Sequence, residues 1–299
     1  MNSILEFTDI TRSYKKGTPV LDGVSFSIAP GEVAGLLGRN GAGKTTLIRI
    51  AMGMLYPHRG AVRVFGLSPT EDPVAVKKRI GYVAEDQVLP PRLTVGDLIA
   101  FHRYLFSHWN DALERQLLDR FGLSPGAKIR HLSKGQARQL ALLCAVCHRP
   151  ELLILDEPAG GLDPAARREF LETSIQLLNR EGTAILFSSH HMTDVERLGG
   201  RVILLDKGKV RLDRDLDSLR EETCLALVPR VTDPEAAGIE RTPGFLGVRR
   251  VLDDWHAVFN GTPDCVGRDL RESLGVNGIR CVTVPLEDLF IELVGGDRS

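Results

Sequence analysis

Short, continuous apolar runs recur along the 299-residue chain and alternate with segments of helical spacing. The apolar runs predict strands buried on both faces, at residues 33–37, 152–155, 184–187 and 202–205. The segments that follow or precede them predict helices, at residues 44–55, 133–148 and 164–179. Because strands that alternate with helices usually form parallel sheets, we expect an α/β fold with a mostly parallel sheet covered on both faces.

Other segments predict smaller parts of the fold. Residues 3–8, 24–28 and 61–65 read as strands of a separate small sheet, and residues 95–122 have helical spacing. After about residue 220 the composition changes, because a stretch rich in Pro and Gly precedes short alternating segments and a final helical pattern. We therefore expect a first domain at residues 1–219 and a small α+β appendage at residues 220–299.

The composition narrows the class of protein. Charged residues make up 26% and the formal net charge is −1, which argues against general nucleic-acid binding. No apolar run approaches the length of a membrane span, and the N-terminus lacks the continuous apolar segment of a signal peptide. Five scattered cysteines fit reduced thiols in the cytosol. We expect a cytosolic chain that reaches a membrane only through a partner.

The stretch CAVCH at residues 144–148 has the spacing of a c-type haem attachment site. It lies inside an apolar run of helical spacing, in which Cys144 and Cys147 share one face with Leu140 and Ala141. Haem attachment would also need an exported chain. We therefore interpret both cysteines as core residues.

The stretch GRNGAGKTT at residues 38–46 directly follows an apolar run and precedes a predicted helix. It matches the phosphate-binding pattern G-x-x-x-x-G-K-[ST], with Gly38, Gly43, Lys44 and Thr45 at the fixed positions. Glycines let backbone N–H groups and the helix N-terminus point at phosphate. Lys44 adds positive charge for the β- and γ-phosphates, and the Thr45 hydroxyl suits Mg²⁺.

Polar residues follow two of the predicted buried strands. In LLILDEP, Asp156 and Glu157 lie at the edge where open α/β sheets bind ligands, although a solvated acidic turn is the alternative. Asp156 would hold Mg²⁺, directly or through water, and Glu157 could take a proton from an attacking water. In FSSHH, His190 could reach a γ-phosphate. It could instead be structural or form a metal-binding pair with His191, but no third ligand is evident nearby.

A second stretch suited to an anion is HLSKGQARQL, at residues 131–140. Ser133 and Gly135 lie where an apolar helix begins, with basic residues on both sides. A Ser N-cap beside a glycine leaves exposed N–H groups at the positive end of the helix. The stretch lies far along the chain from the glycine loop, which raises the question of whose nucleotide it serves.

In their order, these motifs resemble the ATPase subunit of an ABC transporter over about residues 3–215. GRNGAGKTT looks like the Walker A loop, and LLILDEP looks like Walker B with its catalytic glutamate. LSKGQ at 132–136 is similar to the family signature, usually LSGGQ, and GGLDP at 160–164 is similar to the D-loop. The resemblance implies a P-loop NTPase of the ABC-ATPase fold, with a RecA-like core, an antiparallel β subdomain and a helical subdomain at about 86–150.

The resemblance also implies roles for individual residues. Tyr14 matches the aromatic that stacks on adenine, although it could simply pack its turn. The other residues implied to contact ATP are Gly38, Asn40, Gly41, Gly43, Lys44, Thr45, Thr46, Ser133, Gly135, Gln136 and Asp163. Those implied to hold Mg²⁺ are Thr45, Glu85 and Asp156, and those implied in catalysis are Glu157, His190 (the switch histidine) and Lys44.

In this family two ATPase subunits enclose two ATP molecules head to tail. The resemblance therefore implies that Ser133, Gly135 and Gln136 serve the partner's nucleotide, in a homodimer or a heterodimer with a related ATPase. ATP would close the dimer and hydrolysis would reopen it. The motion would act on a separate membrane-spanning permease at the cytoplasmic face of the membrane.

Two residues depart from the family pattern. Lys134 replaces the third signature residue, and a cation near phosphate should be tolerated there. In IGYVAEDQ at residues 80–87, Glu85 stands where the family usually has Gln. Glu can also ligate Mg²⁺, but it would repel an unshielded γ-phosphate. Gln87 is the alternative residue for that role.

The sequence favours an exporter, because LEDLFIEL at residues 286–293 and YLFSHWND at 104–111 resemble export-type subunits. A rival class is a soluble ABC ATPase that acts on DNA or ribosomes. Such proteins usually carry a long coiled-coil insertion or two cassettes, and this chain has one Walker A motif and no sustained heptads. A non-catalytic regulator is a third class, which the presence of Glu157 and His190 disfavours.

Overall fold

The computed structural model describes residues 3–15, 17–162, 164–178, 182–198, 200–229, 238–252, 254–275, 278–284 and 288–290. The chain divides into two units, Met1–Asp213 and Arg214–Ser299. The division falls slightly before the change in composition near residue 220. Each unit has its own hydrophobic core and is described separately.

The first unit contains a six-stranded sheet in the order β5-β6-β7-β3-β8-β9. The strands are β3 (Val33–Leu37), β5 (Ile80–Val83), β6 (Leu152–Leu155), β7 (Ala184–Ser189), β8 (Arg201–Asp206) and β9 (Lys209–Asp215). The four pairings from β5 to β8 are parallel, so the expected parallel α/β sheet is confirmed. The sequence pattern missed β5, which has only four residues and includes Gly81. A Cβ at Gly81 would lie 2.2 Å from the carbonyl oxygen of Ala145, so a helix crosses this strand at very close range.

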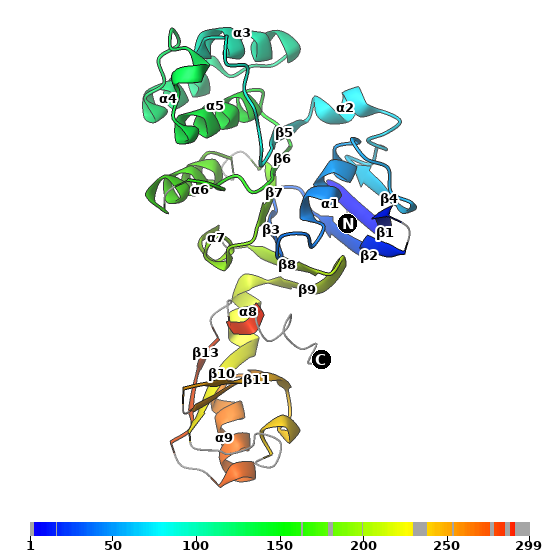
Figure 1. Ribbon diagram of the computed structural model, residues 1–299, viewed down its shortest axis with the longest axis vertical. Helices are drawn as coiled ribbons and strands as arrows, with labels where there is room; N and C mark the ends of the chain where they lie inside the picture. Colours follow the sequence, from blue (N-terminus) through cyan, green and yellow to red (C-terminus); the bar gives the residue numbers. More distant parts are fainter. Residues whose placement is uncertain are drawn as a thin grey trace. The chain divides into compact units, whose positions relative to one another are not determined.

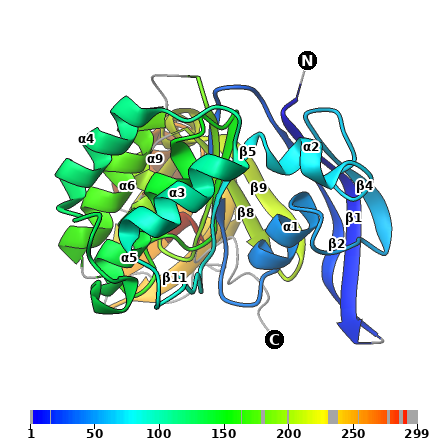
Figure 2. The ribbon, with the colours of Figure 1, turned by 90° about the horizontal axis from the view of Figure 1, so that it is seen from above.

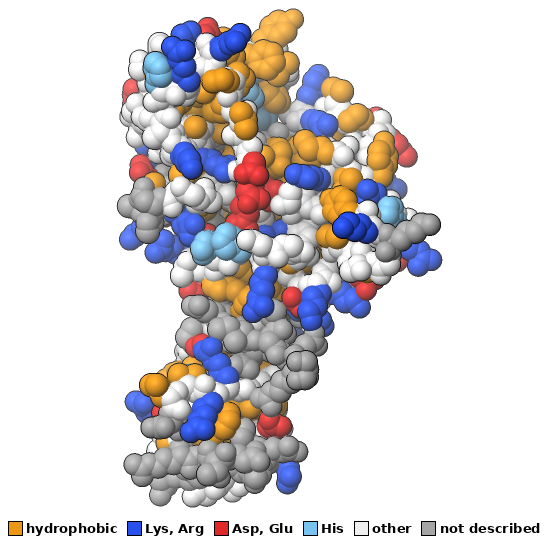
Figure 3. All heavy atoms as spheres, viewed as in Figure 1, with side chains coloured by type: hydrophobic (Ala, Val, Ile, Leu, Met, Phe, Trp, Pro, Cys, Tyr) orange, Lys and Arg blue, Asp and Glu red, His pale blue; other side chains and the backbone are white. Residues whose placement is uncertain are grey.

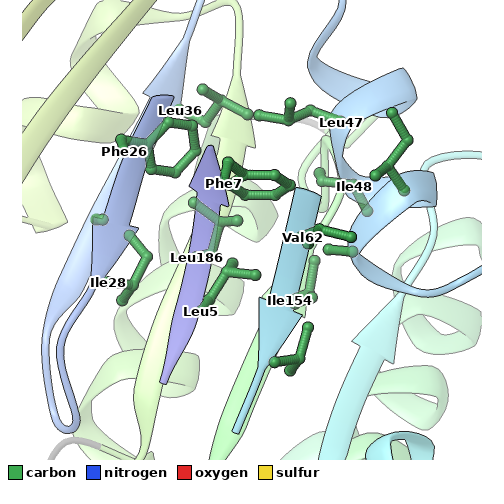
Figure 4. Close-up of a cluster of buried hydrophobic side chains, with 14 of the residues drawn as sticks. Leu5, Phe7, Phe26, Ile28, Leu36, Leu47, Ile48, Val62, Ile154 and Leu186 are labelled. Carbon is green, nitrogen blue, oxygen red and sulfur yellow. The ribbon is translucent and has the colours of Figure 1, made fainter. Parts of the chain in front are cut away.

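A second sheet, in the order β2-β1-β4, is antiparallel. Its strands are β1 (Leu5–Lys15), β2 (Thr18–Ile28) and β4 (Arg59–Val64), so the three expected strands are present and each is longer than predicted. Figure 4 shows the core between the sheets. Phe7 of this sheet lies among Leu47 and Ile48 of helix α1 (Lys44–Ala51), with Ile154 and Leu186 of the parallel sheet close by.

The other helices of this unit are α2 (Pro73–Lys77), α3 (Val95–Leu105), α4 (Asp111–Phe121), α5 (Lys134–Val146), α6 (Pro164–Leu178) and α7 (Met192–Leu198), with a short 3-10 helix at Ile129–His131. Helices α6 and α7 lie on one face of the parallel sheet, and α1 with the antiparallel sheet lies on the other (Figures 1 and 2). Helices α3, α4 and α5 gather at the end of the sheet near β5.

The region predicted to be helical, residues 95–122, forms the two helices α3 and α4. The chain breaks at residues 106–110 because the Asn110 side chain caps α4, accepting a hydrogen bond from Leu113 N at 3.1 Å. Helix α3 begins with a capping box between Thr94 and Asp97. Cys144 in α5 and Cys147 at its C-cap are buried free thiols, which confirms that CAVCH is part of the core.

The second unit is an α+β structure. Its antiparallel sheet has the order β11-β12-β10-β13, formed by β10 (Thr223–Pro229), β11 (Phe245–Val251), β12 (Asp254–Asn260) and β13 (Arg280–Thr283). The helices are α8 (Leu216–Glu222), α9 (Pro263–Leu274) and a 3-10 turn at Ile239–Arg241. Val266 and Leu270 of α9 pack on Cys224 and Phe259 of the sheet. Of the expected final helix, residues 288–290 are helical and the remainder lies outside the described residues.

Candidate active site

The phosphate loop begins where β3 ends and is held by the neighbouring strand. Gly38 N donates a hydrogen bond of 3.3 Å to the carbonyl of Ser189 at the end of β7. Gly43 forms the N-cap of α1 with φ +109°, and a Cβ there would lie 2.6 Å from Leu21 Cδ2. Only glycine fits both constraints, so the loop curls tightly and leaves the first N–H groups of α1 available to an anion.

Lys44 is buried at the start of α1 and is held by its own loop and by an acid. Its Nζ donates to the Gly38 carbonyl at 2.6 Å and lies 3.1 Å from Glu157 Oε1. The second contact is an attraction between charges without hydrogen-bond alignment, since Glu157 Oε1 has no hydrogen-bond partner. The ammonium group therefore lies between the phosphate loop and the end of β6.

Asp156 and Glu157 follow β6, and both are buried. Asp156 Oδ1 accepts hydrogen bonds from Ser188 Oγ at 2.7 Å and from Thr45 Oγ1 at 3.3 Å. Glu157 has φ +44°, a conformation that costs free energy in a non-glycine residue and recurs at functional sites. Its backbone N donates to Ser188 Oγ at 2.8 Å, which helps to hold that turn.

His190 lies directly against the second oxygen of Glu157. Its Nδ1 is 2.8 Å from Glu157 Oε2, and about a third of the side chain remains exposed. The ring of His191 lies 4.0 Å away, centroid to centroid. Within the described ranges no group of three His, Cys, Asp or Glu side chains could hold a metal ion, so a histidine-based metal site gains no third ligand there.

Two serines at the end of β7 support these acids, and sequence reasoning missed their role. Ser188 links Asp156 to the backbone of Glu157, as described above. Ser189 Oγ donates to Asp194 Oδ2 at 2.8 Å and accepts from His191 N at 3.0 Å, which fixes the turn that carries His190. The FSSHH stretch was a possible signal, because two adjacent hydroxyls at the end of an apolar strand are available as hydrogen-bond partners.

Glu85 lines a cavity of about 410 Å³ together with the phosphate loop, Tyr14, Lys44 and Glu157. Burial raises the pKa of Glu85, and the nearby carboxylates of Asp156 and Glu157 raise it further. Burial also raises the pKa of Asp156. Acidic side chains are visible in the middle of the first unit in Figure 3. The site therefore concentrates more buried negative charge than Lys44 balances.

Gln87 has a different environment from Glu85. Its Oε1 accepts a hydrogen bond from Ala84 N at 3.3 Å, so the side chain turns back on its own loop. Gln87 lines a neighbouring cavity and is not among the residues that line the cavity of the phosphate loop. Of the two residues, only Glu85 lines the same cavity as Lys44 and Thr45.

Tyr14 lies at the rim of the same cavity, near the end of β1. Its hydroxyl is 3.2 Å from Thr46 Oγ1, and the guanidinium carbon of Arg12 lies 5.7 Å from its ring centroid. About half of the ring is exposed, at 55%. An exposed aromatic ring beside a phosphate loop can stack on a nucleotide base.

The signature residues lie apart from this cavity. Ser133 and Gln136 form a capping box at the start of α5, in which Gln136 N donates to Ser133 Oγ at 3.1 Å and Ser133 N donates to Gln136 Oε1 at 3.0 Å. The space around Gly135 is open, with the nearest atoms 3.8 Å from a Cβ built there. Neither these residues nor Gly135 lines the phosphate-loop cavity. Asp163, also predicted to contact ATP, lies outside the described residues.

Comparisons with known proteins identify the family of the chain. The family model described as ABC transporter matches residues 21–160. The Nod factor export ATP-binding protein I of Burkholderia thailandensis is 33% identical over 99% of this chain and 98% of its own length. The ABC transporter ATP-binding protein YtrB of Bacillus subtilis is 30% identical over 94% of this chain and 95% of its own. A solved ATP binding subunit of an ABC transporter has a TM-score of 0.66 and 30% identity, covering 73% of this chain and 92% of that chain.

The parallel sheet and its phosphate loop place the chain among the P-loop ATPases. The comparisons narrow that class, and the chain belongs to the family of ABC transporter ATP-binding subunits. ATP binding and hydrolysis are therefore activities of this chain, and the resemblance seen in the motifs is confirmed. Among the described residues no helix is long and apolar enough to cross a membrane.

The raised pKa of Glu85 generates a prediction about pH. If Glu85 ligates Mg²⁺ or its water, protons compete with the metal as the pH falls through that raised pKa. The Mg²⁺ concentration for half-maximal ATP turnover should therefore rise as the pH falls from neutral toward that raised pKa. In Glu85→Gln, activity should persist and this rise should shrink, because the side chain no longer titrates.

The matched variant is Gln87→Ala, which should leave both turnover and its pH dependence as in the wild type. The measurement is steady-state phosphate release at several Mg²⁺ concentrations and pH values. A damaging Gln87→Ala combined with an unchanged pH profile in Glu85→Gln would assign the metal role to Gln87.

Proposed function

We propose that this chain binds ATP with Mg²⁺ in a head-to-tail dimer and drives export through a separate membrane permease, from the cytoplasmic face of the membrane. The observation that supports it most strongly is the separation of two anion-binding elements. The phosphate loop and the start of α5 do not share a cavity, although both offer helix N-termini with free N–H groups. A second subunit is the source of the missing half of each site.

Residues from three elements, α1, the loop after β5 and the end of β6, fit a hard divalent cation. Thr45, Asp156 and Glu85 offer hydroxyl and carboxylate oxygens, the ligands that Mg²⁺ prefers. Burial raises the pKa of Glu85 and of Asp156, and neighbouring carboxylates raise both further, so a bound cation would favour the ionised form of each. When bound, the metal would neutralise charge on the β- and γ-phosphates during phosphoryl transfer.

Different residues of the chain have different roles in ATP hydrolysis. Lys44, now drawn toward Glu157, is within reach of phosphate oxygens that enter the loop. The Glu157 carboxylate accepts the proton of the attacking water, and His190 holds that carboxylate through Nδ1. Burial of Glu157 and Lys44 keeps bulk water away from these charges.

An exposed apolar stripe supports the permease as partner. Phe101, Tyr104 and Leu105 of α3 are 55%, 88% and 48% exposed, and Val88 in the loop after β5 is 87% exposed. Helical spacing puts the three α3 residues on one side. Hydrophobic side chains are visible over α3 in Figure 3. Such a patch on a protein surface marks an interaction site, here for the cytoplasmic part of a membrane protein.

The export direction rests on whole-chain similarity. The Nod factor export protein matches nearly the entire chain, including the unit after residue 213. The name of that relative states what the relative exports, and we do not transfer this cargo to the present chain. For this chain we propose export as the direction and leave the cargo unnamed.

The dimer is tested by mixing two damaged subunits. Lys44→Ala and Ser133→Arg each spoil every site of their own homodimer. In a mixed head-to-tail dimer, one site receives both lesions and the other receives an intact phosphate loop and an intact signature. We expect Mg·ATP to be trapped at up to one site per mixed dimer. Heterodimers confirmed by two affinity tags that trap no nucleotide would contradict the head-to-tail arrangement.

The permease contact is tested on the apolar stripe. The double variant Phe101→Ser and Tyr104→Ser should reduce the fraction of the protein recovered with membranes severalfold, because exposed aromatic anchors carry much of the energy of an interface. Its nucleotide affinity should stay at the wild-type value. The matched control is Val74→Ser, at another apolar residue that is 65% exposed. If the control lost membrane recovery equally, or the double variant lost none, the stripe would not be part of the permease contact.

A further inference from the structure

Arg138 connects the helix that begins with the signature to the loop that carries Glu85. Its Nη1 donates a hydrogen bond to the carbonyl of Ala84, the residue directly before Glu85. The side chain reaches this carbonyl from the second turn of α5, and it is partly buried. The backbone on the strand side of the same loop is also fixed, because Asp156 N donates to the Val83 carbonyl at 2.9 Å. The loop is thus held from the sheet and from α5.

The charges around Arg138 are mostly acidic. It lines a cavity of about 560 Å³ with Glu85, Asp86, Gln87, Lys134 and His190. Burial lowers the pKa of Arg138, while Asp86, Glu85 and Asp156 act in the opposite direction by favouring its charged form. The guanidinium group stays ionised, since an arginine pKa is far above neutral pH. It is therefore a permanent cation placed against the acidic loop.

The loop that carries Glu85 needs a nearby cation because several carboxylates gather at this edge of the sheet. Glu85 adds a carboxylate to an edge that already holds Asp156 and Glu157, and its pKa is raised by burial and, in addition, by these two acids. Lys44 already lies 3.1 Å from Glu157 and 2.6 Å from the Gly38 carbonyl. Without a second cation, repulsion would favour movement of the loop away from the metal edge.

We propose that Arg138 is a positioning residue for the metal edge: it fixes the loop at residues 84–86 against α5, so that Glu85 stays beside Thr45 and Asp156. This inference rests on the proposed function, in which Glu85 serves Mg²⁺. In the head-to-tail dimer, α5 begins at the partner's nucleotide. Arg138 consequently links the helix that serves one nucleotide to the metal edge that serves the other.

The test measures the Mg²⁺ dependence of ATP turnover in Arg138→Met. Loss of residues that orient metal ligands typically costs about 10- to 100-fold in metal affinity or activity. We expect the Mg²⁺ concentration for half-maximal turnover to rise about tenfold, while nucleotide affinity measured without metal stays unchanged. Arg138→Lys retains the charge and should recover part of the effect. Arg115→Met, which removes an exposed cation from α4, is the matched control.

A double-variant cycle with Glu85→Gln separates positioning from simple stability. If Arg138 holds Glu85 in position and offsets its charge, the effect of Arg138→Met should depend on Glu85. Arg138→Met should then raise the half-maximal Mg²⁺ concentration less in the Glu85→Gln background than in the wild type. Thermal unfolding of each variant checks the fold, and Arg138→Lys supplies the comparison if the Met variant unfolds.

Equal effects in both backgrounds, or an unchanged Mg²⁺ dependence in Arg138→Met and Arg138→Lys, would overturn the positioning role. A wild-type protein whose ATP turnover does not depend on Mg²⁺ would overturn the proposed metal function itself. The two failures are distinguishable, because the second is seen in the wild type alone.

Discussion

The attraction between Lys44 and the buried carboxylates at the end of β6 is the interaction on which the site depends. Asp156 and Glu157 are almost fully buried, and burial of charge is costly unless partners balance it. The ammonium group of Lys44 lies 3.1 Å from Glu157 Oε1 and balances part of the negative charge. The hydroxyls of Thr45 and Ser188 donate hydrogen bonds to Asp156. Two buried carboxylates therefore lie together with the one buried ammonium group of Lys44 at this edge.

The parallel sheet is what brings these groups to one place. Because β3, β6 and β7 run in the same direction and are neighbours, their carboxyl ends meet at one edge. The phosphate loop follows β3, the acid pair follows β6, and the serine–histidine turn follows β7. Residues separated by more than a hundred positions in sequence, such as Thr45 and Asp156, come within hydrogen-bond distance in this way.

Much of this arrangement could be predicted from sequence, because apolar runs and glycine spacing are local signals. The strands at β3, β6, β7 and β8 and the phosphate loop were predicted on that basis. Strand β5 was missed because four residues with a glycine give no periodicity, and α9 was missed because its apolar face is narrow within a charged helix. The roles of Ser188 and Arg138 depend on contacts between distant segments, which no local pattern records.

The measurement that tests the account most directly is ATP binding and single-turnover hydrolysis by Glu157→Gln. The variant keeps the size of the side chain and removes the base, and placed general bases typically contribute about 10²- to 10⁴-fold. We expect wild-type ATP affinity, a loss of turnover in that range and accumulation of an ATP-bound dimer, whereas Lys44→Ala should weaken ATP binding itself. Near-normal hydrolysis by Glu157→Gln would contradict the assignment of the base and with it the central role of the buried acids.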